Sequence, residues 1–208
     1  MSCLVAYTGA GMVAVRAAPS DTHVERILAS VGVPARRRER PALAVLAGLP
    51  ATGKTRIAEE LRARTGAVVL ESDELRRLLF RRRSYSTRES RKLFAAVHQA
   101  IERLLAEGIS VVLDATNVAE TERSPLYEMA SRHDARLVLV QVTAPPSLVE
   151  RRLADRRASG EGHSEAGLRV YEHMRWREEE IARPHHIIDT SKPIDRAVAA
   201  IAKEMMQS

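Results

Sequence analysis

Residues 48 to 55 read Gly48-Leu49-Pro50-Ala51-Thr52-Gly53-Lys54-Thr55, a complete phosphate-binding loop (P-loop) of the form G-x-x-x-x-G-K-[ST]. Its glycines let the backbone adopt positive φ and approach phosphate oxygens. Successive N–H groups then form an anion-binding nest, and the helix that follows adds its positive dipole end. We expect Lys54 to contact the β- and γ-phosphates and Thr55 to bind Mg²⁺. All eight residues are therefore predicted to bind a nucleotide.

Both flanks of this loop have the pattern that a P-loop needs. Residues 42–47, Ala-Leu-Ala-Val-Leu-Ala, form an apolar stretch that predicts a buried strand. A helical pattern that includes Ile57 and Leu61 follows over residues 53–64. Strand, loop and helix in this order distinguish a P-loop from an ordinary glycine-rich turn.

Strands and helices alternate along the rest of the chain. Ser86 and Glu89 have the spacing of a capping box at the start of one helix. The alternation predicts an α/β fold, the three-layer P-loop NTPase sandwich with a central parallel sheet and a helical lid. The further predicted strands are 67–70, 110–114, 136–142 and 187–188, and the predicted helices are 53–64, 74–82, 88–107, 120–132, 147–158, 165–182 and one beginning at Pro193.

Composition narrows the classes of function. Of the 208 residues, 45% are hydrophobic and 3% aromatic, and so few aromatic residues argue against extensive stacking platforms for single-stranded nucleic acid. The net charge of +6 favours anionic ligands, although an arginine-rich composition by itself produces such a charge. One cysteine, Cys3, excludes an intramolecular disulfide and a cysteine-based zinc site.

Polar residues follow two of the predicted strands. Residues 71–76 read Glu-Ser-Asp-Glu-Leu-Arg, and residues 114–117 read Asp-Ala-Thr-Asn. Ligands of parallel α/β sheets bind beyond the carboxyl ends of the strands, so these segments are candidates for the site. The predicted helix 147–158 adds Arg152 and Arg156, which are four residues apart and share one helix face.

Together with the P-loop, these segments resemble the small P-loop kinase family that includes the 5′-hydroxyl kinase domain of polynucleotide kinase, zeta toxins and chloramphenicol phosphotransferase. The chain is also similar to AAA-family ATPases and ATP-binding proteins. The resemblance covers about residues 42–190. It rests on G-x-P-x-x-G-K-T at 48–55, D-x-x-R at 73–76, D-x-T-N at 114–117 and R-x-x-x-R at 152–156.

Sequence patterns divide the chain into zones. Residues 1–40 are predicted to be an N-terminal extension that ends in a basic linker, and residues 41–208 a P-loop kinase domain with a lid at about 145–183. Within the extension, Asp21 is the expected N-cap of a helix over 21–31. Ile188-Asp189-Thr190-Ser191 matches the place of the nucleotide base in the family. Ala51 stands where glycine is frequent, and alanine is tolerable there unless φ is positive.

The resemblance implies roles for the residues after the second strand. Asp73 lies where the family places the carboxylate that accepts the proton of the acceptor hydroxyl. Arg76, one helical turn later, is placed to hold an anionic part of the acceptor. A helix N-cap is the alternative role for Asp73. Arg81-Arg82-Arg83 is a candidate extension of the same anion path.

Asp114 ends an apolar stretch, so its carboxylate is expected to face the P-loop and to hold Mg²⁺ through water; a simple strand-end turn is the alternative. Thr116 and Asn117 are candidate acceptor-site residues, against ordinary loop capping. The resemblance implies that Arg152 and Arg156 close over the triphosphate and stabilise charge on the moving phosphoryl group. A solvated basic helix is the alternative for these two arginines.

We therefore predict an ATP- and Mg²⁺-dependent kinase with Lys54, Asp73, Arg152 and Arg156 as catalytic residues, acting on a hydroxyl of a small-molecule or polynucleotide acceptor. The alternative is an ATP-binding switch that hydrolyses ATP slowly and has no need of a base at Asp73. An anionic acceptor is expected, and nucleic acid is a less favoured partner. No run of residues suits a membrane span or a signal peptide, so a cytoplasmic location without a membrane partner is expected.

Overall fold

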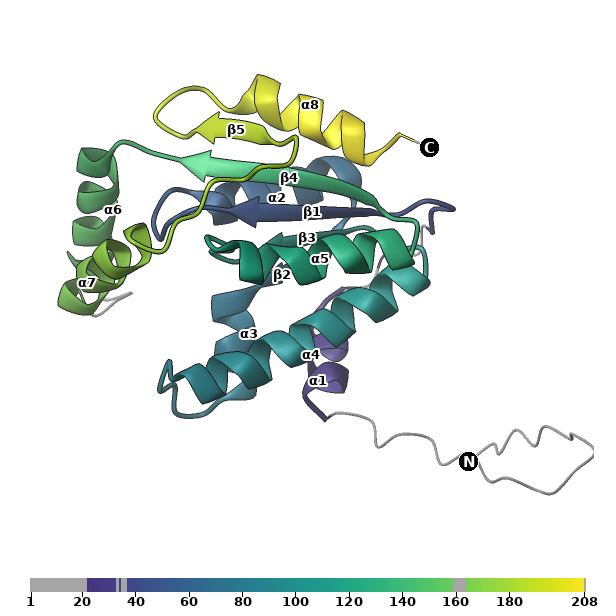
Figure 1. Ribbon diagram of the computed structural model, residues 1–208, viewed down its shortest axis with the longest axis horizontal. Helices are drawn as coiled ribbons and strands as arrows, with labels where there is room; N and C mark the ends of the chain where they lie inside the picture. The colour runs from purple at the N-terminus through teal and green to yellow at the C-terminus, as the bar shows by residue number, and fades with distance from the viewer. Residues whose placement is uncertain (1–21, 33, 35–36, 159–163, 208) are drawn as a thin grey trace, which may run out of the picture.

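Five parallel strands form the central sheet, in the order β2-β3-β1-β4-β5, within the residues that the computed structural model describes, 22–32, 34, 37–158 and 164–207 (Figure 1). Helices cover both faces of the sheet, so the predicted α/β sandwich is confirmed. The strands are β1 (Ala42–Ala47), β2 (Val68–Glu71), β3 (Val111–Asp114), β4 (Arg136–Thr143) and β5 (His186–Asp189). The helices are α1 (Thr22–Ser30), α2 (Lys54–Thr65), α3 (Ser72–Leu79), α4 (Thr87–Ala106), α5 (Glu120–Arg132), α6 (Pro146–Ala158), α7 (Ser164–Arg175) and α8 (Asp195–Met205).

β1 divides the apolar core between the two faces of the sheet. Leu43 and Val45 face one side and pack with α1, α3, α4 and α5. Ala44 and Leu46 face the other side and pack with α2 and α8. All four side chains are fully buried, which explains why residues 42–47 are apolar without alternation: a central parallel strand has no face exposed to water.

The helix α1 shares this core, although it precedes the P-loop region in the chain. Val24 and Ile27 are completely buried and belong to the same apolar cluster as α4. Glu25 forms an ion pair with Arg103 of α4 at 2.5 Å. The helix thus packs on the lower face of the molecule as drawn in Figure 1, beside α3 and α4.

Three helices have boundaries that differ from the sequence prediction by two residues or more. α3 covers Ser72–Leu79 rather than residues 74–82, because Phe80 already has an extended backbone. α7 ends at Arg175 rather than at residue 182, because the chain then turns and binds the start of α5, where the N–H of Glu179 donates to the carbonyl of Val118 at 2.9 Å. α8 begins at Asp195, two residues after Pro193. Asp21, the predicted N-cap of α1, lies outside the described residues.

The parallel register brings polar residues to one edge of the sheet. Asp114 at the end of β3 lies level with Leu46 in β1 and with Glu71 in β2. The helices α6 and α7 lie beyond this edge, on the left of Figure 1. The carboxyl ends of the strands, the P-loop and α6 and α7, the helices of the predicted lid, are therefore neighbours, at the edge where parallel α/β sheets bind ligands.

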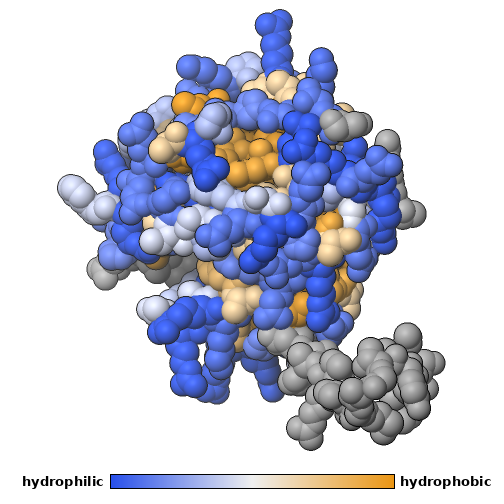
Figure 2. Space-filling view, turned by 45° about the vertical axis from the view of Figure 1, so that its right-hand side comes forward, coloured by the Kyte–Doolittle hydropathy of each residue, from blue (hydrophilic) through white to orange (hydrophobic). Residues whose placement is uncertain are grey.

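The surface shown in Figure 2 is mostly hydrophilic, and apolar side chains are visible mainly where that face is hollowed. Within the described part of the chain, none of the helices is both long enough and apolar enough to cross a membrane.

Candidate active site

The P-loop runs from the end of β1 into α2. Gly48 brings the backbone so close to β4 that a Cβ there would lie 2.3 Å from the carbonyl oxygen of Val142. Gly53 immediately precedes α2 with a φ of 102°, in the left-handed region that favours glycine. The first N–H groups of α2 have no partners inside the helix, so the loop and the helix start together form an anion-binding site.

Ala51 also has positive φ, at 62°, and therefore lies in the conformation in which alanine is unfavourable. The left-handed region costs a residue with a Cβ about 1–2 kcal/mol. The methyl group is buried in an apolar cluster with Leu49, Val118, Val149 and Tyr171. Val149 belongs to α6 and Tyr171 to α7, so this cluster holds the lid helices on the P-loop.

Lys54 is held inside the loop. Its Nζ donates hydrogen bonds to the carbonyl oxygens of Gly48 and Leu49, both at 2.9 Å. Burial lowers the pKa of Lys54 from 10.5 to about 8, against the opposing effect of the negative charges of Asp114 and Asp73. The ammonium group is thus poorly solvated, and an added anion in the loop would be attracted strongly to it.

Thr55 and Asp114 meet below the loop. The Oγ1 of Thr55 donates to Oδ2 of Asp114 at 2.7 Å. Burial raises the pKa of Asp114, while the bond from Thr55 and the charge of Lys54 act in the opposite direction. No cluster of three or more His, Cys, Asp or Glu residues suited to a metal occurs within the described ranges. Mg²⁺ is usually held by one or two protein oxygen ligands together with substrate phosphates and water, so an ion at Thr55 and Asp114 would take its other ligands from those sources.

Glu71 lies beside Asp114; the sequence placed it in a candidate segment but indicated no role for it. It is half-buried at the end of β2, directly beside Asp114 on β3. Burial, and then the charge of Asp114, raise the pKa of Glu71 to about 7. Its position at a strand end was the available signal, since the same reasoning selected Asp114.

Asp73 lies in the first turn of α3 and is exposed. The residue at the N-cap of α3 is Glu71, so the alternative in which Asp73 caps the helix is wrong. After burial and Asp114, the charge of Asp73 is the next largest influence on the pKa of Lys54. The carboxylate of Asp73 therefore acts on the P-loop lysine, from a position open to solvent.

Arg76 links α3 to α4. It is buried, and its Nη1 forms an ion pair with Oε1 of Glu89 at 2.6 Å, while Nη2 donates to Oγ of Ser90 at 3.3 Å. Its guanidinium also lies 4.8 Å from the centre of the Tyr85 ring. A role for Arg76 in binding the acceptor stays a prediction, and that role would have to compete with this ion pair.

The predicted capping box at the start of α4 forms only in part. Ser86 caps the helix, since its Oγ accepts a bond from the N–H of Glu89 at 3.3 Å. The carboxylate of Glu89 does not return to Ser86 but accepts bonds from the N–H and the hydroxyl of Ser84, at 2.7 and 2.8 Å. The ion pair with Arg76 draws that carboxylate inward, away from the position a capping box requires.

Arg152 links three segments. Its Nη1 donates to the carbonyl oxygens of Ala51 and Thr52 and to Oγ1 of Thr190, at 3.1, 3.0 and 2.9 Å. The side chain therefore joins α6 to the back of the P-loop and to the loop after β5. The predicted partner of Arg152, a transferring phosphoryl group, stays a prediction.

Arg156 is exposed on α6, one turn beyond Arg152. Besides burial and the nearer charges, its positive charge contributes to lowering the pKa of both Lys54 and Asp114. Of the two predicted lid arginines, Arg156 is thus the one whose charge acts on both the P-loop lysine and the strand-end carboxylate.

Thr116 and Asn117 form hydrogen bonds to the end of β1 and the first residue of the P-loop. The carbonyl of Thr116 accepts a bond from the N–H of Gly48 at 2.8 Å. Asn117 is buried with a φ of 45°, and its Nδ2 donates to the carbonyl of Leu46 at 2.7 Å. A role in the acceptor site stays a prediction for both residues.

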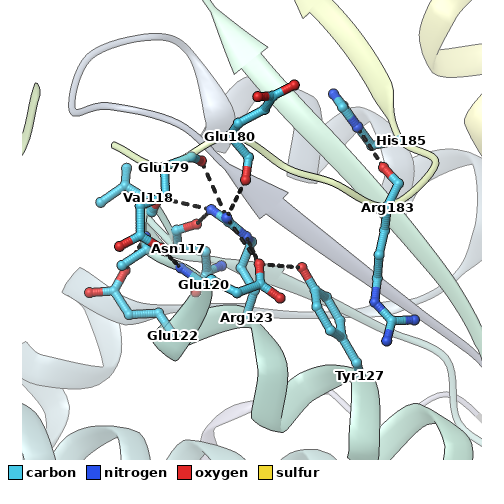
Figure 3. Close-up of polar contacts among 11 residues, drawn as sticks. Asn117, Val118, Glu120, Glu122, Arg123, Tyr127, Glu179, Glu180, Arg183 and His185 are labelled. Carbon is cyan, nitrogen blue, oxygen red and sulfur yellow. Dashed lines mark hydrogen bonds and ion pairs between the residues drawn. The ribbon is translucent and has the colours of Figure 1, made fainter. Parts of the chain in front are cut away.

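Figure 3 centres on Arg123, a residue that sequence reasoning missed. Its side chain is 1% exposed, although it carries a charge and belongs to a helix. It joins the start of α5 to the segment that leaves the lid, so it fixes where the lid returns to the sheet. Its donors bind the carbonyls of Asn117, Val118, Glu179 and Glu180 and the carboxylate of Glu120.

Residues 43–181 match the family model described as AAA domain. The chain belongs to the AAA domain family. The matched residues of this AAA domain protein include the P-loop, Asp73, Asp114 and both lid helices, and they leave out α1 and α8. No curated protein matches the sequence.

Solved structures share the fold of the AAA domain protein. The APS kinase CysC of Mycobacterium tuberculosis, in complex with AMPPNP and APS, is 17% identical with a TM-score of 0.62, and the match covers 81% of this chain and 99% of that chain. Kti12 of Chaetomium thermophilum, in complex with ADP-AlF3, is 21% identical with a TM-score of 0.61, over 78% and 96%. A gluconokinase from Sinorhizobium meliloti 1021 is 19% identical with a TM-score of 0.54, over 82% and 93%. The predicted resemblance to P-loop kinases is thereby confirmed at the level of the fold.

Proposed function

We propose that this AAA domain protein is an ATP- and Mg²⁺-dependent kinase that transfers the γ-phosphoryl group of ATP to a hydroxyl group. One observation carries the proposal: the Nζ of Lys54 lies 2.9 Å from the P-loop carbonyl oxygens of Gly48 and Leu49, and the next residue, Thr55, bonds to the carboxylate of Asp114 at 2.7 Å. After burial and Asp114, the charges of Asp73 and Arg156 also act on the pKa of this lysine. Phosphoryl transfer uses such a set, in which cations and a metal ion neutralise the phosphates and a carboxylate orients the attacking oxygen.

The residues of the site fit ATP and Mg²⁺. The backbone of the P-loop lies bare at Gly48, where a side chain would collide with β4. Lys54 already donates to oxygen atoms within the loop, and phosphate oxygens are acceptors of the same kind with more charge. Thr55 and Asp114 offer a hydroxyl and a carboxylate, which suit the preference of Mg²⁺ for oxygen ligands. When bound, the ion would neutralise charge on the phosphates.

Asp73 is the proposed acceptor-side base. It takes the proton of the acceptor hydroxyl while that oxygen bonds to the γ-phosphorus and the bond from phosphorus to the ADP oxygen breaks. Because Asp73 is exposed, it can release the proton to water afterwards. Lys54 and Arg156 stabilise the charge of the phosphates from the loop and from the lid.

The substitution Asp73→Asn tests this assignment. With γ-labelled ATP and a panel of acceptors (5′-hydroxyl oligonucleotides, sugars, nucleotide sugars, aminoglycosides and chloramphenicol), the wild type should label at least one acceptor. The variant should lose roughly 10²-fold or more in rate, since an amide cannot accept the proton. Its thermal stabilisation by Mg-ATP should stay intact, because Asp73 serves the acceptor.

Glu74→Gln is the matched control, since Glu74 is the next exposed carboxylate on α3 and should tolerate the change in both assays. A wild type that Mg-ATP does not stabilise would overturn the proposed nucleotide site. Stabilisation by Mg-ATP with slow hydrolysis and no labelled acceptor would instead favour an ATP-binding switch.

A further inference from the structure

The turn after α3 and the first residues of α4 carry a dense group of cations that the proposed transfer does not use. Residues 81–92 read Arg-Arg-Arg-Ser-Tyr-Ser-Thr-Arg-Glu-Ser-Arg-Lys, with six cations and one acid. We name these residues the basic tip. All of its cations are exposed to solvent. They are Arg81, Arg82, Arg83, Arg88, Arg91 and Lys92.

The single acid of the basic tip does not neutralise these cations. Glu89 is 7% exposed, and its carboxylate accepts bonds from Ser84 and Arg76 in the interior. The N–H of Ser84 first, and then Arg76, lower the pKa of Glu89 to about 2, so its charge stays paired inside the fold. Among the ion pairs of the described residues, none involves a cation of the basic tip. Within the described residues, the cations of the basic tip thus have no carboxylate partner.

The basic tip also presents an aromatic ring. Tyr85 is 63% exposed, and its φ of 51° lies in the left-handed region that disfavours residues other than glycine. The guanidinium of the buried Arg76 lies 4.8 Å from the ring centre. Arg76 is itself held by Glu89, so the ring is supported from within while most of its surface faces solvent.

The basic tip lies at the functional end of the molecule. In Figure 1 the turn between α3 and α4 is on the same side as the lid helices and the carboxyl ends of the strands. It follows α3, whose first turn carries Asp73 and which is 8 residues long. At about 1.5 Å per residue, the helix extends roughly 9 Å from Asp73 to Leu79, and the basic tip begins two residues later.

We infer that the basic tip is a binding surface for single-stranded nucleic acid. Closely spaced cations without counter-ions match the regular negative charges of a phosphate backbone, and binding is favoured by the release of the condensed counter-ions of that backbone. An exposed aromatic ring among such cations stacks with an unpaired base, as in proteins that bind single strands. An acidic peptide has the charge but gives the Tyr85 ring no base to stack with. The low aromatic content of the chain argues against extensive stacking platforms, but a single exposed ring among cations is enough to stack with one base.

Fluorescence anisotropy with a labelled single-stranded DNA of about 15 nucleotides tests the inference and needs no ATP. The wild type should bind with an affinity that falls steeply between about 50 and about 200 mM salt. Each phosphate contact contributes about −0.7 to the slope of log affinity against log salt, so the expected slope is roughly −2 to −4.

Two pairs of variants locate the surface. Arg82→Gln with Arg83→Gln should make the slope shallower by about 1.4 and weaken binding about tenfold or more at the lower salt. Arg196→Gln with Lys203→Gln removes the same charge from the exposed side of α8 and should change affinity by less than about twofold. Tyr85→Ala should weaken binding about tenfold, whereas Tyr85→Phe keeps the ring and should bind like the wild type.

Several results would overturn the inference. These are absence of binding by the wild type, an equal loss in the α8 variant, and equal affinity for a poly-glutamate peptide of the same length. If Tyr85→Ala binds as tightly as Tyr85→Phe, the ring does not stack with a base, and the basic tip is a surface for polyanions in general rather than for single strands. Because stabilisation by Mg-ATP is measured separately, the nucleic-acid surface and the proposed kinase site fail independently.

Discussion

The hydroxyl of Thr55 and the carboxylate of Asp114 are joined by a 2.7 Å hydrogen bond, although 59 residues separate them in the chain. The parallel pairing of β1 with β3 brings them together, because it places Asp114 level with Leu46, just before the P-loop. A hydroxyl at the start of α2 and a carboxylate at the end of β3 thus lie side by side beneath the loop. This pair is the basis for the proposed position of Mg²⁺.

Asp114→Asn should remove the effect of Mg²⁺ on nucleotide binding. In thermal unfolding, Mg-ATP should stabilise the wild type more than ATP with EDTA does, and this difference should disappear in the variant. Without nucleotide, the variant should be at least as stable as the wild type at pH 7, since burial disfavours the ionised form of Asp114. Asp134→Asn changes an exposed carboxylate and should keep the Mg²⁺ effect. A persistent effect in Asp114→Asn would place the ion elsewhere.

Lys54→Met should stabilise the protein in the absence of nucleotide. The pKa of Lys54 is about 8 in the fold and 10.5 as its ordinary value, so the unfolded chain binds more protons between these values. Burial of the ammonium group therefore costs stability below pH 8, and the cost fades as pH rises to 10.5. The difference in pKa corresponds to about 3 kcal/mol.

The variant should thus unfold at higher denaturant concentration than the wild type at pH 7, with a smaller advantage near pH 10. Saturating Mg-ATP should reverse the order, because the wild type alone gains stability from binding. Lys203→Met, at an exposed position on α8, should show no such pH dependence. A Lys54→Met variant that is less stable at pH 7 would contradict this account.

Arg152 and Arg156 should differ, although both lie on one face of α6. Arg152→Ala removes bonds to the P-loop carbonyls and to Thr190, so we expect weaker ATP binding together with faster hydrogen exchange in α6. Lysine should not rescue it, since one ammonium group cannot reproduce the forked guanidinium. Arg156→Ala should lower the rate of transfer by about 10³-fold or more with little change in ATP affinity. Equal, small effects of both changes would favour a diffuse basic helix.

Ala51→Gly should change stability little, because two effects oppose each other. Glycine relieves the positive φ, worth about 1–2 kcal/mol, and loses one buried methyl group, worth about 0.8 kcal/mol. The net gain in the free energy of unfolding should lie between about zero and 1 kcal/mol. The lid should loosen, because the methyl group packs with Val149 and Tyr171, and limited proteolysis of α6 and α7 measures this.

Ala51→Val is the contrasting variant. A β-branched side chain at a φ of 62° should destabilise the protein by about 2 kcal/mol or more in urea unfolding. A valine variant as stable as the wild type would show that the loop relaxes out of the left-handed region without cost.

Local sequence patterns were sufficient to predict the layers of the fold and the nucleotide-binding loop. Residues 42–47 are apolar throughout because β1 is buried on both faces, and the order of glycine, lysine and threonine in the P-loop is a local requirement of phosphate binding. Asp114 could be selected because a charge at the end of an apolar strand is itself a local signal.

The partners of the charged side chains depended on tertiary structure. Arg76 and Arg123 are charged helix residues, yet both are buried. Arg76 binds Glu89, and Arg123 binds the carbonyls of Glu179 and Glu180. The end of α7 and the position of Arg152 likewise follow from contacts with α5 and the P-loop.

The amino-acid sequence by itself determined the parallel α/β fold and the phosphate-binding loop, because buried strands and tight loops are specified by neighbouring residues. Only the tertiary structure decided which arginines support the protein and which remain available to a ligand. The physical reason is that a guanidinium group binds whichever carboxylates and carbonyls the packed elements bring within reach, and sequence spacing does not reveal those partners.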